Sequence, residues 1–308
     1  MDEDEAIATL TRLLGDAIGD DCFAFTVGDR TWALSTDMLF QDTDLPPRSS
    51  PEDWGWKAMA ATISDLVSAG TVPRFLLLAI GVPEDSSDLV GPIAVGAKAC
   101  CEAHDCRYVG GDLSVTDRVT LASFGLGEGD RVPGRSSAVP GHLLCVTGEM
   151  GTARLGLLCL QAGIDDAEDI VKAFLRPRIQ AGSAGPVGEL ASASMDISDG
   201  LARSVRQLAE RSDVGVDVVL SDVPCYSRAK ELCERLSVSF EDIVIGGGEE
   251  FETLLTLSPD QLEEARTSIP TLTVIGRVTE RAKGLTLVCG ERRERLPSVG
   301  WRTYGVST

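Results

Sequence analysis

The sequence predicts an α/β protein of the mixed α+β kind, built from two domains. Its 308 residues are 43% hydrophobic, which is enough for a substantial core, and the length favours two domains over one. Apolar strand-like runs alternate with segments of helical periodicity in both halves. A polar stretch at 131–141, with Pro133, Gly134 and Pro140, separates the halves. We therefore expect one domain over residues 1–137 and a second over 138–308.

The chain begins with an amphipathic segment, residues 2–14, and continues into a predicted β-hairpin. The apolar runs at 22–27 and 31–39 are separated by Gly28 and Asp29, a short turn of the kind that connects antiparallel strands. We expect these two runs to pair in the first sheet.

A helix is predicted after the hairpin. Ser50 is the expected N-cap, Pro51 the first helical residue and Asp53 the acid of a capping box, while Gly70 closes the far end. Its buried stripe is expected to contain Trp56, Met59, Ala60, Ile63 and Val67.

The remaining elements follow the same alternation. The first half continues with strands at 74–82, 107–109 and 119–127 and a helix at 88–104. In the second half we expect strands near 143–147, 216–220, 251–257, 272–278 and 285–289, and helices near 151–161, 199–211 and 227–236. The glycine-rich stretch 182–188 predicts a loop.

The composition excludes several classes of function. A formal charge of −20 argues against nucleic acid and against an anionic membrane surface, since both are bound by clustered Lys and Arg. No apolar stretch approaches the roughly 20 residues that cross a bilayer, and the N-terminus is acidic, so we expect a cytoplasmic protein. The nine cysteines form no CxxC pair and are interpreted as buried hydrophobes. His104, near three of them, is interpreted as a solvated helix end.

The chemically suggestive residues are carboxylates beside Gly, Ser or Thr. Asp in turns and caps is common, because its side chain satisfies local backbone donors. Asp65 lies inside the predicted helix among small residues, and Asp112 follows two glycines at the end of a short strand. Asp199 begins a predicted helix, so either Ser198 or Asp199 is alternatively its N-cap. The full set is Asp20, Asp21, Asp37, Asp65, Asp112, Asp196 and Asp199.

If these carboxylates converge, they repel one another unless cations neutralise them. Oxygen ligands in loops suit Mg²⁺, which binds through a few carboxylates together with substrate phosphates. This pattern predicts phosphoryl transfer, where catalysis is mainly positioning and charge neutralisation. The common ATP motifs are missing, so a nucleotide must be held differently. The segment GGGEEFE at 246–252 is unusual, although a flexible loop is the simpler interpretation.

The order of the motifs GDD, STDM, SPEDWGWKAMAATISDL, GGDL, DISDG, GGGEEFE and GWRTY resembles the thiamine-monophosphate kinase family of the AIR-synthase-like superfamily. The resemblance extends from about residue 15 to 304. It implies a two-domain AIR-synthase-like fold, with an N-terminal sheet that pairs across a homodimer, a C-terminal α/β domain and an ATP site between them. It also implies direct transfer of the γ-phosphate of ATP to thiamine monophosphate, with several Mg²⁺ ions.

Carried over by motif, the resemblance assigns roles to individual residues. The metal ligands would be Asp20 or Asp21, Thr36, Asp37, Asp65, Asp112 and Asp196, with Asp199 at a further ion; of these, Asp37, Asp112 and Asp196 would be catalytic. ATP would contact Gly111, Asp112, Arg135 and Ser198. The substrate would contact Asp44, which replaces a His of the family, Glu249 or Glu250 or, less favoured, Glu252, and Trp301 or Tyr304.

Alternatives remain at this point. Asp44 can instead begin the turn before Pro46 and Pro47. The chain can also be another enzyme of the superfamily, such as AIR synthase or selenophosphate synthetase, or a nucleotide-binding protein without catalysis. A hydrogenase-maturation dehydratase is disfavoured, because that enzyme needs a C-terminal cysteine and this sequence finishes with YGVST.

Overall fold

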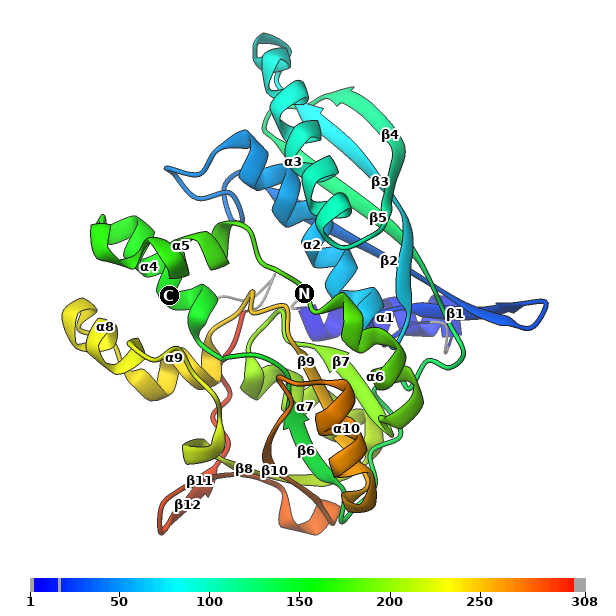
Figure 1. Ribbon diagram of the computed structural model, residues 1–308, viewed down its shortest axis with the longest axis vertical. Coiled ribbons are helices and arrows are strands. Elements are labelled where there is room, and N and C mark those ends of the chain that lie inside the picture. The colour runs from blue at the N-terminus through cyan, green and yellow to red at the C-terminus, as the bar shows by residue number, and fades with distance from the viewer. Residues whose placement is uncertain (1–2, 16–17, 302–308) are drawn as a thin grey trace.

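The computed structural model describes residues 3–15 and 18–301 of the chain. Two sheets organise it, one from each half of the sequence (Figure 1). The first sheet has the order β1-β2-β5-β3-β4, and the second has the order β12-β11-β8-β10-β6-β9-β7. The predicted domain boundary at 137/138 lies between β5 and β6, in a stretch without helix or strand.

The elements of the first half are α1 (Glu3–Leu14), β1 (Phe23–Val27), β2 (Arg30–Phe40), α2 (Pro51–Ser68), β3 (Val72–Val82), α3 (Val90–Ala103), β4 (Arg107–Val115) and β5 (Thr120–Gly129). Those of the second half are β6 (Leu143–Val146), α4 (Thr152–Ala162), α5 (Glu168–Leu175), α6 (Ala184–Leu190), β7 (Ala193–Asp196), α7 (Leu201–Ser212), β8 (Gly215–Val219), α8 (Ala229–Leu236), α9 (Phe240–Gly246), β9 (Thr253–Leu257), α10 (Leu262–Ser268), β10 (Thr273–Thr279), β11 (Leu285–Cys289) and β12 (Arg292–Arg295).

The predicted hairpin is confirmed as β1 and β2. The strands are antiparallel and Val27 pairs with Arg30, which leaves Gly28 and Asp29 as the turn. Gly28 has a φ of 64°, a value that costs glycine little and other residues more. The turn therefore fixes the register of β1 against β2, the strand that contains Asp37.

Helix α2 lies at the centre of the molecule, and its predicted capping box is present. The Ser50 hydroxyl accepts from the Asp53 amide, and the Asp53 carboxylate accepts from the Ser50 amide at 2.9 Å. One side of α2 packs on α3 so closely that a Cβ at Gly55 would lie 1.9 Å from the Ile93 carbonyl oxygen. Its last turn contacts the second domain, where the Ser194 hydroxyl donates to the Ser68 carbonyl at 2.6 Å. The helix therefore joins the two halves.

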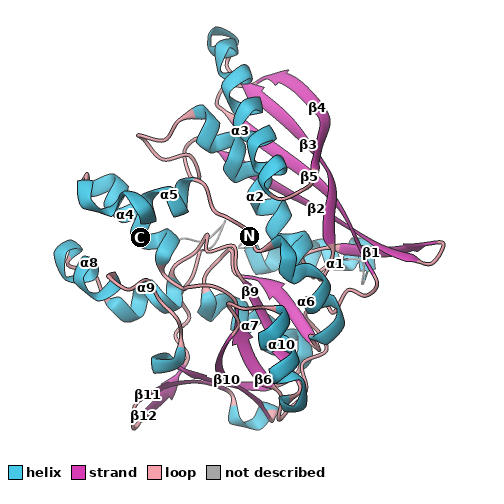
Figure 2. Ribbon diagram, viewed as in Figure 1, coloured by secondary structure: helices cyan, strands magenta, loops and turns pink. Residues whose placement is uncertain are grey.

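Helices α2 and α3 cover one face of the first sheet, and Figure 2 shows the other face without a helix over β3 and β4. Strand alternation places Ser35, Asp37 and Ser123 on the face toward α2. The opposite face, here called the outer face, is exposed and largely apolar. Its exposed side chains include Met38, Phe40, Phe75, Leu77 and Phe124.

Several predictions about the second half were wrong or incomplete. Residues 182–188, predicted as a loop, are helical: they contain most of α6. Gly188 of α6 is required for packing, because a Cβ there would lie 2.8 Å from the Gly70 carbonyl oxygen. Burial of Val187 and Leu190 against Leu255 offsets the poor helix propensity. Elements that the sequence did not predict are α5, β7, α9, α10 and β12.

His104 was also misinterpreted. It caps the C-terminal end of α3 and is buried, with 6% of its surface exposed. Nδ1 contacts the Cys100 carbonyl oxygen at 2.7 Å, and Nε2 accepts from the Ile179 amide at 3.0 Å. Burial lowers the pKa of His104, which favours the neutral ring that these two contacts require. The cysteines agree with the prediction that they are mostly buried: all nine are unpaired, and seven of them are buried.

Candidate functional site

Three carboxylates converge where the two domains meet. Asp21, Asp65 and Asp196 each place an oxygen within 4.8 Å of the other two. Asp21 precedes β1, Asp65 belongs to α2, and Asp196 ends β7. Two of them therefore come from the first domain and one from the second. We call these three residues the acidic cluster.

Asp37 extends the acidic cluster along β2. It lies on the face of the sheet toward α2, and its carboxyl shares a hydrogen bond with that of Asp65. The Ser35 hydroxyl also donates to Asp65. Burial, with the nearby negative charges, raises the pKa of Asp37 to about 6 and holds the pKa of Asp65 well above its usual range. Without a cation, the two buried carboxylates therefore repel each other.

Asp196 is the most enclosed member of the acidic cluster. It is 3% exposed and accepts hydrogen bonds from Ser198 at 3.2 Å and Ser64 at 3.4 Å. Burial and the charge of Asp21 raise the pKa of Asp196 well above its usual range. A buried carboxylate is costly unless a cation or several donors compensate it. The two serines supply only part of that compensation.

Arg135 is the cation beside the acidic cluster. Its guanidinium forms an ion pair with Asp21, and its amide donates to Asp20 Oδ1 at 2.6 Å. The sequence left open whether Asp20 or Asp21 belongs to the site. In the structure Asp21 faces the acidic cluster, whereas Asp20 binds the backbone of the 131–141 segment. Both contacts keep the arginine at the edge of the site.

Thr36, Gly111 and Asp112 do not join the acidic cluster within this chain. Thr36 points to the outer face. Asp112, in β4, pairs with Ala79 of β3 and has an exposed side chain. Asp112 is therefore inside a nine-residue strand and not at the end of a short one. Packing within the sheet requires a glycine at position 111, since a Cβ there would lie 1.8 Å from the Leu78 carbonyl oxygen. The roles predicted for these three residues stay predictions.

Asp199 and Ser198 follow the acidic cluster along the chain. Neither is the N-cap of α7, because Gly200 occupies that position and no side chain caps the helix. Asp199 instead forms an ion pair with Arg203 at 2.9 Å. Its carbonyl accepts from the Trp301 amide at 3.0 Å, which brings the exposed Trp301 close to the site. Tyr304 lies outside the described residues.

The 246–252 segment is a constrained loop and not a flexible one. Glu249 and Phe251 have φ values of 65° and 51°, which are unfavourable for residues other than glycine. The Glu249 amide donates to the Ser198 carbonyl at 2.6 Å and the Phe251 amide to the Ile197 carbonyl at 3.1 Å. The loop is thus fastened to the strand end that carries Asp196.

The three acids of this loop have different surroundings. Glu249 forms an ion pair with Lys57, a buried residue of α2 that the sequence analysis missed. Glu250 accepts from the Ala153 amide at 3.1 Å, at the N-terminus of α4. Glu252 accepts from Thr147 at 2.5 Å and from Gln180 at 3.0 Å. Burial raises the pKa of Glu250 to about 8 and that of Glu252 to about 7.

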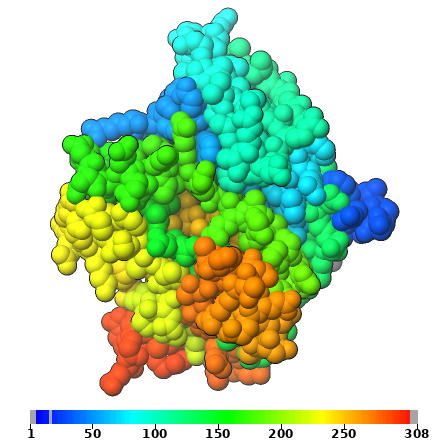
Figure 3. All heavy atoms as spheres, in the orientation of Figure 1, coloured from blue at the N-terminus to red at the C-terminus, as the bar shows by residue number. Residues whose placement is uncertain are grey.

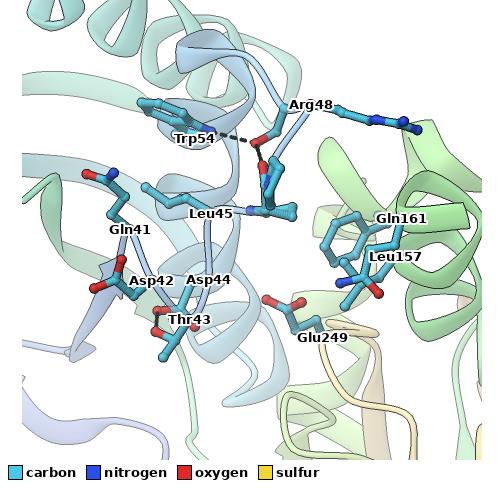
Figure 4. A pocket seen from close by; sticks show the side chains of 14 residues that line it. Gln41, Asp42, Thr43, Asp44, Leu45, Arg48, Trp54, Leu157, Gln161 and Glu249 are labelled. Atoms are coloured by element: carbon cyan, nitrogen blue, oxygen red, sulfur yellow. Dashed lines mark hydrogen bonds between the residues drawn. The ribbon is translucent and has the colours of Figure 1, made fainter. Parts of the chain in front are cut away.

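A cavity of about 500 Å³ opens beside Glu249, and we call it the interdomain cavity. One wall is the loop 41–49 after β2, and the other is formed by α4 and α5, which adjoin that loop on the face in Figure 3. Figure 4 shows Asp44 on the first wall and Glu249 reaching in from the second domain. Both residues were predicted to contact substrate, and both line the cavity.

Asp44 also closes the turn that directly follows β2, whereas the alternative interpretation placed it at the start of the turn before Pro46 and Pro47. Its Oδ2 accepts from the Phe40 amide at 2.8 Å and from the Thr43 hydroxyl at 2.7 Å. Trp54 donates to the Ser49 hydroxyl at 2.7 Å, which braces the other end of the same loop. A second cavity, of about 780 Å³, lies on the other side of Glu249 and includes Glu250 and Glu252 in its lining.

Comparisons with known proteins identify the relatives of this chain. The family profile of the AIR synthase related protein, N-terminal domain, matches residues 19–128, and that of the C-terminal domain matches residues 139–288. The thiamine-monophosphate kinase of Halobacterium salinarum is 36% identical over 288 residues, or 93% of this chain and 96% of its own length. That of Methanospirillum hungatei is 34% identical over 92% of this chain and 94% of its own.

Solved structures extend the comparison. The structure of AaThiL complexed with AMPPCP and TMP superposes with a TM-score of 0.90 at 28% identity, and the match covers 98% of this chain and 97% of that one. The hydrogenase maturation protein HypE in complex with ATP, at 21% identity and a TM-score of 0.70, shares the fold. The matches span both domains with more than 30% identity to two of the relatives, and the chain therefore belongs to the thiamine-monophosphate kinase family of the AIR synthase related proteins.

Proposed function

We propose that this protein phosphorylates thiamine monophosphate to thiamine diphosphate, with ATP as the phosphoryl donor. The proposal rests on one observation: helix α2 contributes to both the interdomain cavity and the acidic cluster, at different positions along its length. Trp54 lines the cavity, and Asp65 lies eleven residues further along α2, a rise of about 16 Å. A substrate with a phosphate at one end and an aromatic ring at the other fits that arrangement.

The residues of the acidic cluster suit Mg²⁺. Asp21, Asp65 and Asp196, with Asp37 beside them, offer the hard oxygen ligands that this ion prefers. Burial raises the pKa values of Asp37, Asp65 and Asp196, as expected for carboxylates whose charges the protein alone does not compensate. When bound, Mg²⁺ would neutralise the phosphates and hold their oxygens together. We propose that these four carboxylates hold the metal, and that Asp199 contributes to a further ion.

The chemistry then needs no covalent intermediate with the protein. An oxygen of the substrate phosphate attacks the γ-phosphorus, the bond from the γ-phosphorus to the β,γ-bridging oxygen breaks, and ADP leaves with that electron pair. Arg135, at the edge of the acidic cluster, would hold phosphate oxygens of ATP in bidentate fashion. Ser198, whose hydroxyl faces Asp196, would contact the same nucleotide. These residues position the reactants and balance their charge.

The interdomain cavity would hold the thiamine rings. The thiazolium ring carries a permanent positive charge, and Asp44 and Glu249 bring carboxylates to the cavity walls. The aromatic ring of Phe174 also lines the cavity, and aromatic faces attract cations. Trp301 is exposed, and its amide donates to the Asp199 carbonyl, so its aromatic side chain would contact the substrate.

We further propose that the protein is a homodimer that pairs through the outer face of the first sheet. Monomers rarely expose a wide apolar face, and here β2, β3 and β5 each contribute exposed apolar side chains. Asp112 and Thr36 lie on this face, so in a dimer they would border the second subunit. The proposal therefore explains why these two predicted ligands are separated from the acidic cluster within one chain.

A substitution on the outer face tests the dimer. Phe124→Glu places a charge in the middle of the face, and Val95→Glu, on an exposed position of α3, is the matched control. By sedimentation, the wild type and Val95→Glu should be dimers and Phe124→Glu a monomer with little activity. A fully active wild-type monomer would rule the dimer out.

A panel of acceptors tests the reaction. The purified protein should convert thiamine monophosphate, and neither thiamine nor an aminoimidazole precursor, to a phosphorylated product with ATP. A product from the aminoimidazole precursor instead would assign the chain to another AIR-synthase-like enzyme. Nucleotide binding without any product would indicate that the chain is a nucleotide-binding protein without catalytic activity.

A further inference from the structure

Lys57 is a charged residue buried in the middle of α2, with 3% of its surface exposed. A lysine is almost never buried to this extent unless it is paired. Its ammonium forms an ion pair with Glu249 and lies 3.3 Å from the Asp44 carbonyl oxygen. It also lies 4.2 Å from the centroid of the Phe174 ring, a cation–π contact.

The three partners of Lys57 share one property: Asp44, Phe174 and Glu249 all line the interdomain cavity. They come from three separate segments, namely the loop after β2, helix α5 and the 246–252 loop. Lys57 is not among the residues that line the cavity, so it acts from behind the wall. One ammonium group thus connects the parts of both domains that form the pocket.

We propose that Lys57 is a positioning residue for substrate recognition, which holds the Glu249 carboxylate in the wall of the interdomain cavity. This inference rests on the proposed function, because it concerns the pocket assigned to the thiamine rings. Glu249 has a strained backbone, with φ at 65°, and a charged side chain, so it needs a partner to keep one orientation. Lys57 supplies that partner at a fixed point of a rigid helix.

The charge of Lys57 also sets the charge of the pocket. Asp44 and Glu249 together carry two negative charges, and Lys57 cancels one of them. The remaining single negative charge matches the single positive charge of a thiazolium ring. Without Lys57, two uncompensated carboxylates would face each other across the cavity, and Glu249 would be free to turn toward solvent.

Two other roles for Lys57 give different outcomes. If its charge only repelled the cationic substrate, its removal would lower KM for thiamine monophosphate. If it only stabilised the fold, its removal would lower the melting temperature and leave KM unchanged. Positioning of Glu249 predicts a higher KM for thiamine monophosphate, an unchanged KM for ATP, and an effect that depends on Glu249.

The test is a double-mutant cycle of Lys57→Met and Glu249→Gln in the full-length protein. Lys57→Met should raise KM for thiamine monophosphate at least tenfold, equivalent to about 1.4 kcal/mol, with KM for ATP within twofold of wild type. In the Glu249→Gln background the same change should alter KM less than threefold, because the partner is already lost. Lys98→Met is the control, since that exposed lysine pairs with Glu102 on the surface.

The outcomes separate this inference from the proposed function. Wild-type protein without thiamine diphosphate synthesis would refute the function, and binding of thiamine monophosphate by calorimetry would then test the pocket in the same four proteins. A fall or no change in KM for Lys57→Met, or an equal rise in both backgrounds, would overturn the role of Lys57. If Lys57→Met does not fold, Lys57→Gln keeps a donor for the Asp44 carbonyl and should show the same rise.

Discussion

The carboxylates of Asp65 and Asp196 place oxygens within 4.8 Å of each other, although one belongs to α2 of the first domain and the other ends β7 of the second. Burial raises the pKa of both residues well above the usual range, with neighbouring carboxylates adding to the effect. The two domains therefore bring together like charges that only a bound cation or a proton can balance.

Asp65→Asn should have opposite effects on activity and on metal-free stability. Loss of one ligand charge should lower kcat at least a hundredfold, because charge neutralisation is the main source of catalysis. Removal of a repelled charge should raise the free energy of unfolding of the EDTA-treated protein, by on the order of 1 kcal/mol. Kinetics and thermal unfolding with and without Mg²⁺ measure both. Near-wild-type kcat would reduce Asp65 to a structural residue.

Asp44→Asn separates the two roles of this residue. Asparagine keeps an acceptor for the Phe40 amide, so the turn should survive, but the charge facing the cavity is lost. Loss of an interaction with a charged group costs roughly 1.5–3 kcal/mol, which predicts that KM for thiamine monophosphate rises about tenfold or more. KM for ATP should stay within twofold. Asp42→Asn, in the same cavity wall, is the control, because Asp42 pairs with Arg118 at the surface. Equal rises in both KM values would assign Asp44 to the turn or the metal site.

The buried acids of the 246–252 loop predict how stability depends on pH. Burial raises the pKa of Glu250 from its ordinary value of 4.5 to about 8, so between these values the folded protein binds more protons than the unfolded chain. The free energy of unfolding of the metal-free protein should therefore fall as pH rises from about 5 to about 8. Glu250→Gln should reduce this slope by up to about 1.4 kcal/mol per pH unit.

Chemical denaturation at constant ionic strength measures that slope. Glu263→Gln is the matched control, since the Glu263 side chain is 89% exposed and should leave the slope unchanged. A Glu250→Gln protein with the wild-type slope would show that Glu250 is ionised in the folded state across this range.

The net charge predicts the effect of salt. A charge of −20 on one chain repels itself, and the Debye length falls to about 3 Å at 1 M salt. The melting temperature should therefore rise from low salt to 1 M KCl. Chloride is preferable to sulfate, because sulfate stabilises most proteins by exclusion from their surfaces. A melting temperature that falls steadily with KCl would contradict this expectation.

The sequence was most informative where local chemistry decides the structure. The capping box at Ser50 and Asp53 and the turn at Gly28 are satisfied by neighbouring residues, so both could be predicted without the rest of the fold. Helix α6 could not, because its Gly188 is required by contact with Gly70, which is more than a hundred residues away. Tertiary packing overrides propensity in such a segment.

The candidate site, too, could be predicted only in part. The acidic residues could be selected because small residues surround them. When a strand is longer than expected, however, the sequence does not show which face of the strand each acidic residue occupies. Strand β4 continues to Val115, which places Asp112 on the outer face. Lys57 was missed because its partners Asp44 and Glu249 are separated from each other by two hundred residues. A lysine flanked by Trp56 and Ala58 within a buried helix was the available clue.

The most direct measurement is a single-turnover reaction of the purified protein with γ-labelled ATP, thiamine monophosphate and Mg²⁺. We predict that the label appears in thiamine diphosphate, with one ADP formed for each molecule of product, and that EDTA abolishes the reaction. Label released as inorganic phosphate without thiamine diphosphate, or a rate that EDTA leaves unchanged, would contradict metal-dependent phosphoryl transfer to this substrate.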